Sequence, residues 1–152
     1  LAKTKASGKV IVTSGELTKA GRPTFDGMLV STKFAGEHPG FVVAMVRAMA
    51  KADADYRANK AKWTSDSPQV KAVAKWTKAD AKDVPAAMAL YKFPTLEEQV
   101  SPTWLGGGKD GMAAKALADT ASFLKEQGRV QAVASDYSQF VNPGFARKAL
   151  GK

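Results

Sequence analysis

The chain contains no cysteine and only one histidine among its 152 residues. Without cysteine there is no disulfide framework, no thiolate zinc site and no cysteine nucleophile. The single imidazole, His38, has no cluster of carboxylates around it in the sequence, so a metal-dependent enzyme would lack ligands. Many periplasmic bacterial proteins also lack cysteine, and this absence favours that compartment.

Long apolar runs are absent as well. A helix that spans a bilayer needs roughly 18 apolar residues, and the best candidate, residues 41–50, contains Arg47 and is followed by Lys51. The lysines near the N-terminus are not followed by an apolar segment, so we expect a secretory signal to be absent or already removed. Because the chain begins with Leu1 rather than Met, we expect a processed or truncated product.

Positive charge exceeds negative charge, with 23 Lys and Arg against 14 Asp and Glu and a net charge of +9. Such a balance raises the question of nucleic acid. The lysines are scattered and mostly alternate with acids, however, which is typical of solvated helix surfaces. We therefore do not expect nucleic acid as a partner, although the field would favour encounter with small anions.

Most of the chain after Ala44 shows helical periodicity and helix-capping signals. Apolar residues at helical spacing predict a long helix that starts near Glu37–Gly40 and ends at Asn59. Further helices are predicted over residues 68–76, 83–93, 95–99 and 112–128, and a short amphipathic piece over 135–141 precedes a frayed tail. Residues 101–111, which are rich in glycine, are predicted to form a loop.

Two short segments near the N-terminus have strand-like sequences. Residues 10–13, VIVT, predict one strand, and a second is expected to begin at Asp26 or Gly27 and to end at Lys33. Residues 14–23 between them read as a loop, because they contain two glycines and a proline. A lone pair of strands is marginally stable in water, so the chain is expected to be part of something larger.

Two other patterns have structural and functional interpretations. The GGGKDG sequence at residues 106–111 resembles a phosphate-binding loop, but it lacks the GxxxxGK pattern followed by Ser or Thr, and we expect a helix connection.

The aromatic residues have helical spacing, which predicts core packing, while some of them are expected to line a cleft between domains. They are Tyr56, Trp63, Trp76, Tyr91, Phe93 and Trp104.

Asp26 is the candidate ligand-binding residue. It lies in RPTFDGM, where the predicted loop meets the predicted strand, beside Phe25 and Gly27. A carboxylate in this position can face a cleft and bind a cationic group, or it can simply cap a turn. The residue pattern leaves both interpretations open.

Four blocks of sequence carry a family resemblance: GKVIVTSGEL, GRPTFDGMLVSTKFAGEHPGFVVAMVRA, DVPAAMALYKFPTLEEQ and ADTASFLKEQGRVQAVASDYSQFV. In this order they resemble the C-terminal half of bacterial taurine-binding proteins of sulfonate ABC transporters. The resemblance implies an α/β fold of the type II periplasmic-binding-protein kind, with two lobes around a cleft. Here it would be an incomplete, mostly helical C-terminal portion with two or three short strands.

The resemblance also implies a domain layout and a site. Residues 1–20 would end the second lobe, residues 21–34 would form the crossing between lobes and a strand, and residues 35–152 would return as helices to the first lobe. Asp26 would bind the taurine ammonium group, with Phe25 and Thr24 beside it. Met28 stands where family members often carry a bulky aromatic residue, and the GGGKDG loop looks longer than usual.

The function implied by the resemblance is capture of taurine or a related small sulfonate in the periplasm, for delivery to the membrane permease of an ABC importer. It implies no enzymatic activity and no cofactor, and it makes the N-terminal half of the same protein a necessary partner. The alternative is a basic interaction protein, or a stable proteolytic remnant, that binds polyanions without a specific small ligand. Steep salt dependence of binding would distinguish that alternative.

Overall fold

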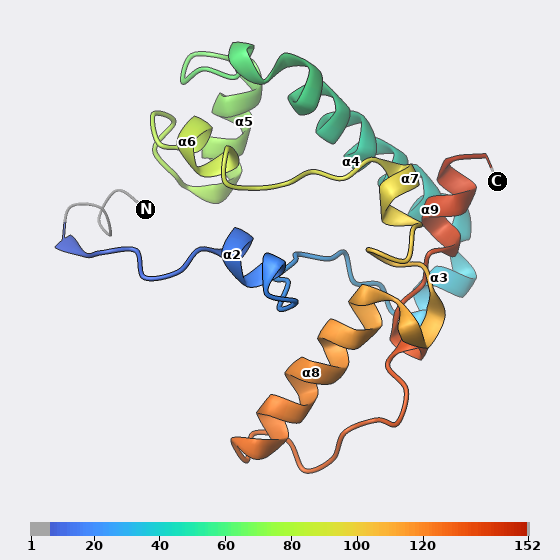
Figure 1. The fold of residues 1–152 in the computed structure, drawn as a ribbon. Coiled ribbons are helices and arrows are strands. Elements are labelled where there is room, and N and C mark those ends of the chain that lie inside the picture. The colour runs from blue at the N-terminus through green and yellow to red at the C-terminus, as the bar shows by residue number, and fades with distance from the viewer. Residues whose placement is uncertain (1–6, 152) are drawn as a thin grey trace. The chain divides into compact units, whose positions relative to one another are not determined.

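The computed structural model describes residues 7–151 as a set of helices joined by turns and irregular segments (Figure 1). Residues 1–6 of the expected first region lie outside this range. The chain divides into two compact units, which we describe separately. None of the helices in the described range combines the length and the apolar character that a membrane span requires.

The first unit comprises residues 50–93 together with the described residues 7–11. It contains the last turns of α4 (Pro39–Asn59), the 3₁₀ turn η1 (Lys60–Lys62), α5 (Pro68–Thr77) and α6 (Val84–Met88). Ser67 caps α5 by accepting a hydrogen bond from Val70 N, and Pro68 occupies the first helical turn, where the sequence predicted the helix to begin. The helix that was predicted over residues 83–93 is shorter, because α6 ends at Met88.

An aromatic and aliphatic cluster forms the core of this unit. Its buried members are Tyr56, Trp63, Val70 and Val84. Tyr56 packs edge-on against both Trp63 and Phe93, with ring centroids 5.0 Å apart in each pair. The predicted core role of the aromatic residues is therefore confirmed for Tyr56 and Trp63. It is wrong for Trp76, which is 80% exposed beneath the Lys75 ammonium group, and for Tyr91, which is 59% exposed.

The second unit comprises residues 12–49 and 94–151. Its helical elements are α2 (Ser14–Lys19), α3 (Thr32–Glu37), the first part of α4, α7 (Leu96–Gln99), η2 (Gly108–Asp110), α8 (Met112–Glu126), η3 (Ser138–Phe140) and α9 (Gly144–Ala149). Arg47 on α4 donates to the carbonyl oxygens of Lys148 and Ala149 at the end of α9, at 3.1 and 3.2 Å. This contact stabilises the α9 C-terminus, because the last carbonyls of a helix lack partners within it.

The predicted strands are wrong within residues 7–151. Residues 10–13 and residues 26–31 are irregular, and Thr32 and Lys33, expected at the end of the second strand, begin α3 instead. The physical reason is that a strand exists only by pairing, and the described chain offers neither segment a partner. Only the mostly helical character of the expected fold is confirmed.

Two segments that were predicted to be irregular are helical. Residues 14–19 form α2, because Thr13 and Glu16 make a capping box, and Gly21 at φ 77° follows the helix end. The tail after Pro143 forms α9 rather than fraying. Conversely, the amphipathic piece predicted over 135–141 contains only the short turn η3.

The glycine-rich segment at residues 101–111 is a tightly closed loop. Leu105 N donates to Gln99 O and Gly106 N donates to Ser101 O, both at 2.9 Å, while Met112 N donates to Pro102 O at the same distance. A side chain on Gly106 would collide with the carbonyl oxygen of Val100, and one on Gly111 would collide with that of Gly106. Close approach of the backbone therefore explains why glycine occupies these two positions.

We predict that Gly106→Ala lowers the free energy of unfolding by about 2 kcal/mol, because the added methyl group cannot be accommodated without moving backbone. Urea unfolding followed by circular dichroism measures the change. Gly36→Ala is the matched control: it adds the same methyl group to α3, where nothing lies within 4 Å. It should raise stability by up to about 1 kcal/mol, since alanine favours helix. Equal effects of the two substitutions would contradict the close-approach explanation.

We also predict that the α2 cap depends on pH. The Thr13 hydroxyl and amide donate to Glu16 Oε2 at 2.7 and 2.8 Å, and these hydrogen bonds lower the pKa of Glu16 from its ordinary value. A lowered pKa means that the cap stabilises α2 above the ordinary glutamate range and is lost as the pH falls through the pKa of the folded chain. Thr13→Val should raise the Glu16 pKa in an NMR titration; an unchanged midpoint would show that the hydroxyl has no such effect.

Candidate ligand-binding site

The segment that carries Asp26 begins where α2 ends. Arg22 N donates to Leu17 O at 2.8 Å, which fixes the turn after α2, and Pro23 is half-buried. From Thr24 to Val30 the chain is irregular and exposed. The backbone of residues 24–30 makes no hydrogen bond with another described residue, so local sequence does not determine the course of this segment.

An ion pair attaches the start of the segment to α8. The Arg22 guanidinium lies 3.2 Å from Asp119 Oδ2, and the two side chains are 70% and 57% exposed. Because 97 residues separate the partners, no pattern in the sequence indicated this contact. It is a contact beside the candidate segment that sequence reasoning missed.

A small hollow lies beside this ion pair. Its volume is about 270 Å³, and it is lined by Gly21, Pro23, Asp110, Met112, Lys115, Ala116 and Asp119. One cationic and two anionic side chains border it, so its charge could complement a zwitterion. The lining charged residues are all exposed, however, and water screens their field strongly.

The predicted site residues lie next to this hollow in sequence but do not line it. Thr24, Phe25 and Asp26 are all exposed. Asp26 makes no hydrogen bond or ion pair with any residue in the described range. Within the described range, the carboxylate of Asp26 therefore has no hydrogen-bonding or ion-pair partner.

The other candidate positions have structural explanations. His38 caps the C-terminal end of α3, and its ring packs on Phe34 with centroids 4.8 Å apart. The GGGKDG loop is closed by its own backbone hydrogen bonds, as described above, instead of following a strand. No group of three or more metal-ligating side chains occurs within residues 7–151.

The carboxyl groups with shifted pKa values lie outside the segment that carries Asp26. Burial raises the pKa of Asp53 on α4, partly opposed by Arg57. Hydrogen bonds from the Ser138 amide and hydroxyl lower the pKa of Asp136, with a small contribution from Lys109. Hydrogen bonds from Lys82 lower the pKa of Asp80. Each of these shifts has a local structural cause, and none involves the Asp26 segment.

Comparison with known proteins tests the family resemblance that the sequence suggested. The chain matches no protein-family model. It is 34% identical over 140 residues to the taurine-binding periplasmic protein of Escherichia coli (strain K12), and the match covers 92% of this chain and 42% of that protein. The predicted resemblance to taurine-binding proteins is thus confirmed, and the extent of the match is consistent with a C-terminal portion. The chain spans about two fifths of the length of the curated relative it matches.

We predict that the ion pair between Arg22 and Asp119 contributes little to stability, because both side chains are mostly exposed. Arg22→Gln should lower the free energy of unfolding by less than about 1 kcal/mol, and the difference should fall in about 1 M salt. Arg129→Gln, which removes the same charge beyond the end of α8, is the control. A loss above about 2 kcal/mol would mean that the pair is desolvated and holds the segment in place.

Proposed function

We propose that this chain is part of a periplasmic solute-binding component of an ABC importer, which captures taurine or a related small sulfonate. The observation that carries the proposal is the 34% identity to a taurine-binding periplasmic protein over 92% of the chain. The chain would act by binding and not by catalysis. The permease of the importer would be its membrane partner.

Asp26 would bind the ammonium group of the ligand. Its exposed carboxylate has no cationic partner among the described residues, so it does not have to give up an ion pair in order to bind. A charge-assisted hydrogen bond to ammonium is stronger than a neutral one. Phe25 and Thr24 would form the adjacent wall. Groups that hold the sulfonate are expected from another part of the protein, including helix N-termini suited to anions.

A further portion of the same protein would complete both the sheet and the cleft. Residues 9–12 and 24–30 expose apolar side chains, and Ile11 and Leu29 are each 94% exposed. Their backbone groups make no hydrogen bonds within the described chain, as an unpaired edge would. Strands supplied by the remaining portion would pair with these segments and cover Ile11 and Leu29.

In this proposal the parts of the chain have separate roles. Residues 1–20 would end one lobe, residues 21–34 would cross between the lobes, and residues 35–152 would belong mainly to the other. Closure of the two lobes around the ligand would then move the Asp26 segment, since hinges of this kind use a few residues at the ends of elements.

We predict that Asp26→Asn in the full-length protein weakens taurine binding at least about tenfold, because it removes a charge-assisted hydrogen bond. Isothermal titration calorimetry gives the dissociation constant. Asp66→Asn, at an exposed turn before α5, makes the same chemical change away from the segment and should leave the affinity unchanged. Equal affinities for the Asp26 variant and the parent would remove Asp26 from the site.

The 152-residue chain itself provides a second test of the same proposal. If another portion supplies the sulfonate-binding groups, the isolated chain should bind taurine far more weakly than the full-length protein. Native mass by light scattering should accompany the titration, because exposed strand segments favour self-association. Full affinity in a monomeric 152-residue chain would contradict the need for a further portion. Binding of polyanions with steep salt dependence, without taurine binding, would favour the basic interaction protein instead.

A further inference from the structure

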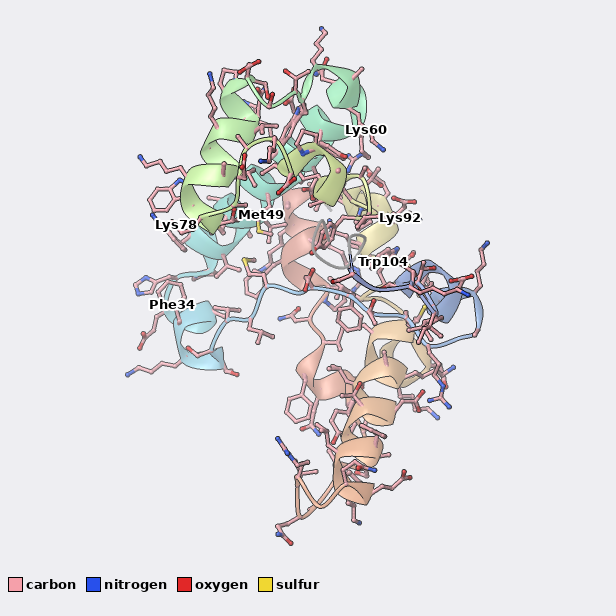
Figure 2. The ribbon with its side chains drawn as sticks, turned by 90° about the vertical axis from the view of Figure 1, so that its left-hand side faces the viewer. Phe34, Met49, Lys60, Lys78, Lys92 and Trp104 are labelled. Atoms are coloured by element: carbon pink, nitrogen blue, oxygen red, sulfur yellow. The ribbon has the colours of Figure 1, made fainter. Side chains whose placement is uncertain are left out.

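A second hollow occurs in the first unit, far along the chain from Asp26. It lies where α4 ends, and its volume is about 460 Å³, within the range of small-molecule pockets. Tyr56, Lys60, Ala61, Trp63 and Pro85 line it. Figure 2 labels Lys60, which belongs to the η1 turn after α4. Aromatic rings, proline and alanine thus form most of the wall, and one charged side chain borders it.

The aromatic wall is held in a defined orientation. Tyr56 and Trp63 are 5% and 8% exposed, and their rings meet edge to face with centroids 5.0 Å apart. Trp63 Nε1 donates a hydrogen bond to Asp55 Oδ2 at 3.2 Å. Asp55 also accepts from Asn59 Nδ2 at 2.9 Å, which fixes the carboxylate. A ring held in this way loses little freedom when a ligand packs on it.

Tyr56 lines the hollow, and its hydroxyl is a polar group without an identified partner. Its oxygen is buried and has no hydrogen-bond partner among the described residues. A buried hydroxyl without a partner is destabilising, and such groups in native proteins usually have a functional or solvent partner. A ligand oxygen that enters the hollow would supply the missing acceptor.

The charged side chains at the hollow indicate which kind of ligand it can bind. Among the described residues, Lys60 is the only charged one that lines the hollow, and it forms no ion pair with any of them. The nearby Asp55 carboxylate already accepts hydrogen bonds from Trp63 and Asn59. The charged side chain on the described lining of the hollow is positive, which favours an anionic group.

We propose that this hollow binds a small organic anion with a flat apolar body, such as an aromatic carboxylate. The apolar body packs against Trp63 and Pro85, one anionic oxygen accepts a hydrogen bond from the Tyr56 hydroxyl, and Lys60 supplies the countercharge. This ligand differs from the zwitterion proposed for Asp26, because the hollow offers no free carboxylate for an ammonium group. The inference does not depend on the proposed function.

Benzoate is a suitable probe for the 152-residue chain, with binding followed by ligand-observed NMR and by two-dimensional spectra of the Trp63 indole. Benzamide keeps the ring without the charge, and acetate keeps the charge without the ring. We expect saturable binding of benzoate, with benzamide and acetate each at least about fivefold weaker, since each lacks one of the two interactions. No saturable benzoate binding, or equal binding of benzoate and benzamide, would overturn the proposal.

Two variants with matched controls test whether Tyr56 and Lys60 bind benzoate. Tyr56→Phe should weaken benzoate binding about tenfold, because a hydrogen bond to a charged acceptor is lost. Tyr91→Phe removes the same hydroxyl from an exposed ring and should have no effect. Lys60→Gln should weaken binding about threefold, as for an exposed ion pair, and Lys62→Gln on the same turn should not. Equal effects in a variant and its control would overturn the assignment.

The unfolding temperature provides an independent check that the variants fold. Tyr56→Phe without ligand should unfold at the same temperature as the parent or slightly higher, because the hydroxyl that it removes has no partner in the part of the chain that the structure describes. A clear decrease would show that the hydroxyl has a partner within the chain, which would contradict the premise. Benzoate binding that weakens as protein concentration rises would show that a second copy occupies the hollow, and would also overturn the proposal.

Discussion

The structure of this chain depends on one constraint, which is that an extended backbone needs a neighbour for its hydrogen-bonding groups. The strand-like sequences at residues 10–13 and 26–31 are irregular, and no strand pairs with them in the described chain. Water can solvate their amides and carbonyls, but it cannot compensate for exposed side chains such as Ile11 and Leu29. Their irregular conformation and their exposed apolar side chains therefore have the same cause.

The helical part of the chain provides partners for its backbone hydrogen-bonding groups within each helix. An α-helix pairs its backbone groups within one segment, and only its ends need help from caps. Capping boxes at Thr13 and Thr95 and a serine cap at Ser67 provide that help. Helices can therefore form in this chain whether or not a partner is present, whereas its strands cannot.

The two candidate sites also differ in whether their backbone is unpaired or helical. The Asp26 segment consists of exposed, unpaired backbone, so its geometry as a site depends on groups that lie outside the segment. The hollow near Tyr56 is formed by α4, η1 and α6, and a single carboxylate, Asp55, orients its tryptophan. The first site is supported by sequence similarity and the second by geometry, and each needs its own experiment.

Sequence reasoning predicted the helices well, because caps and periodicity are local signals. It placed α4, α5, α7 and α8 close to their observed ranges. It was wrong for residues 14–19, where the capping signal at Thr13 and Glu16 was present but two glycines and a proline were given more weight. It was also wrong for Trp76, because helical spacing alone does not tell which aromatic residues a small core covers.

The sequence by itself determined the longer helices α4, α5 and α8, the absence of cysteine chemistry and the similarity to taurine-binding proteins, since each of these follows from local residue patterns. Only the tertiary structure showed that Arg22 meets Asp119, that the backbone closes around Gly106, and that the Tyr56 hydroxyl is buried without a partner among residues 7–151. These three features join residues that are distant in the sequence, or depend on the space around one atom. No local pattern encodes either kind of information.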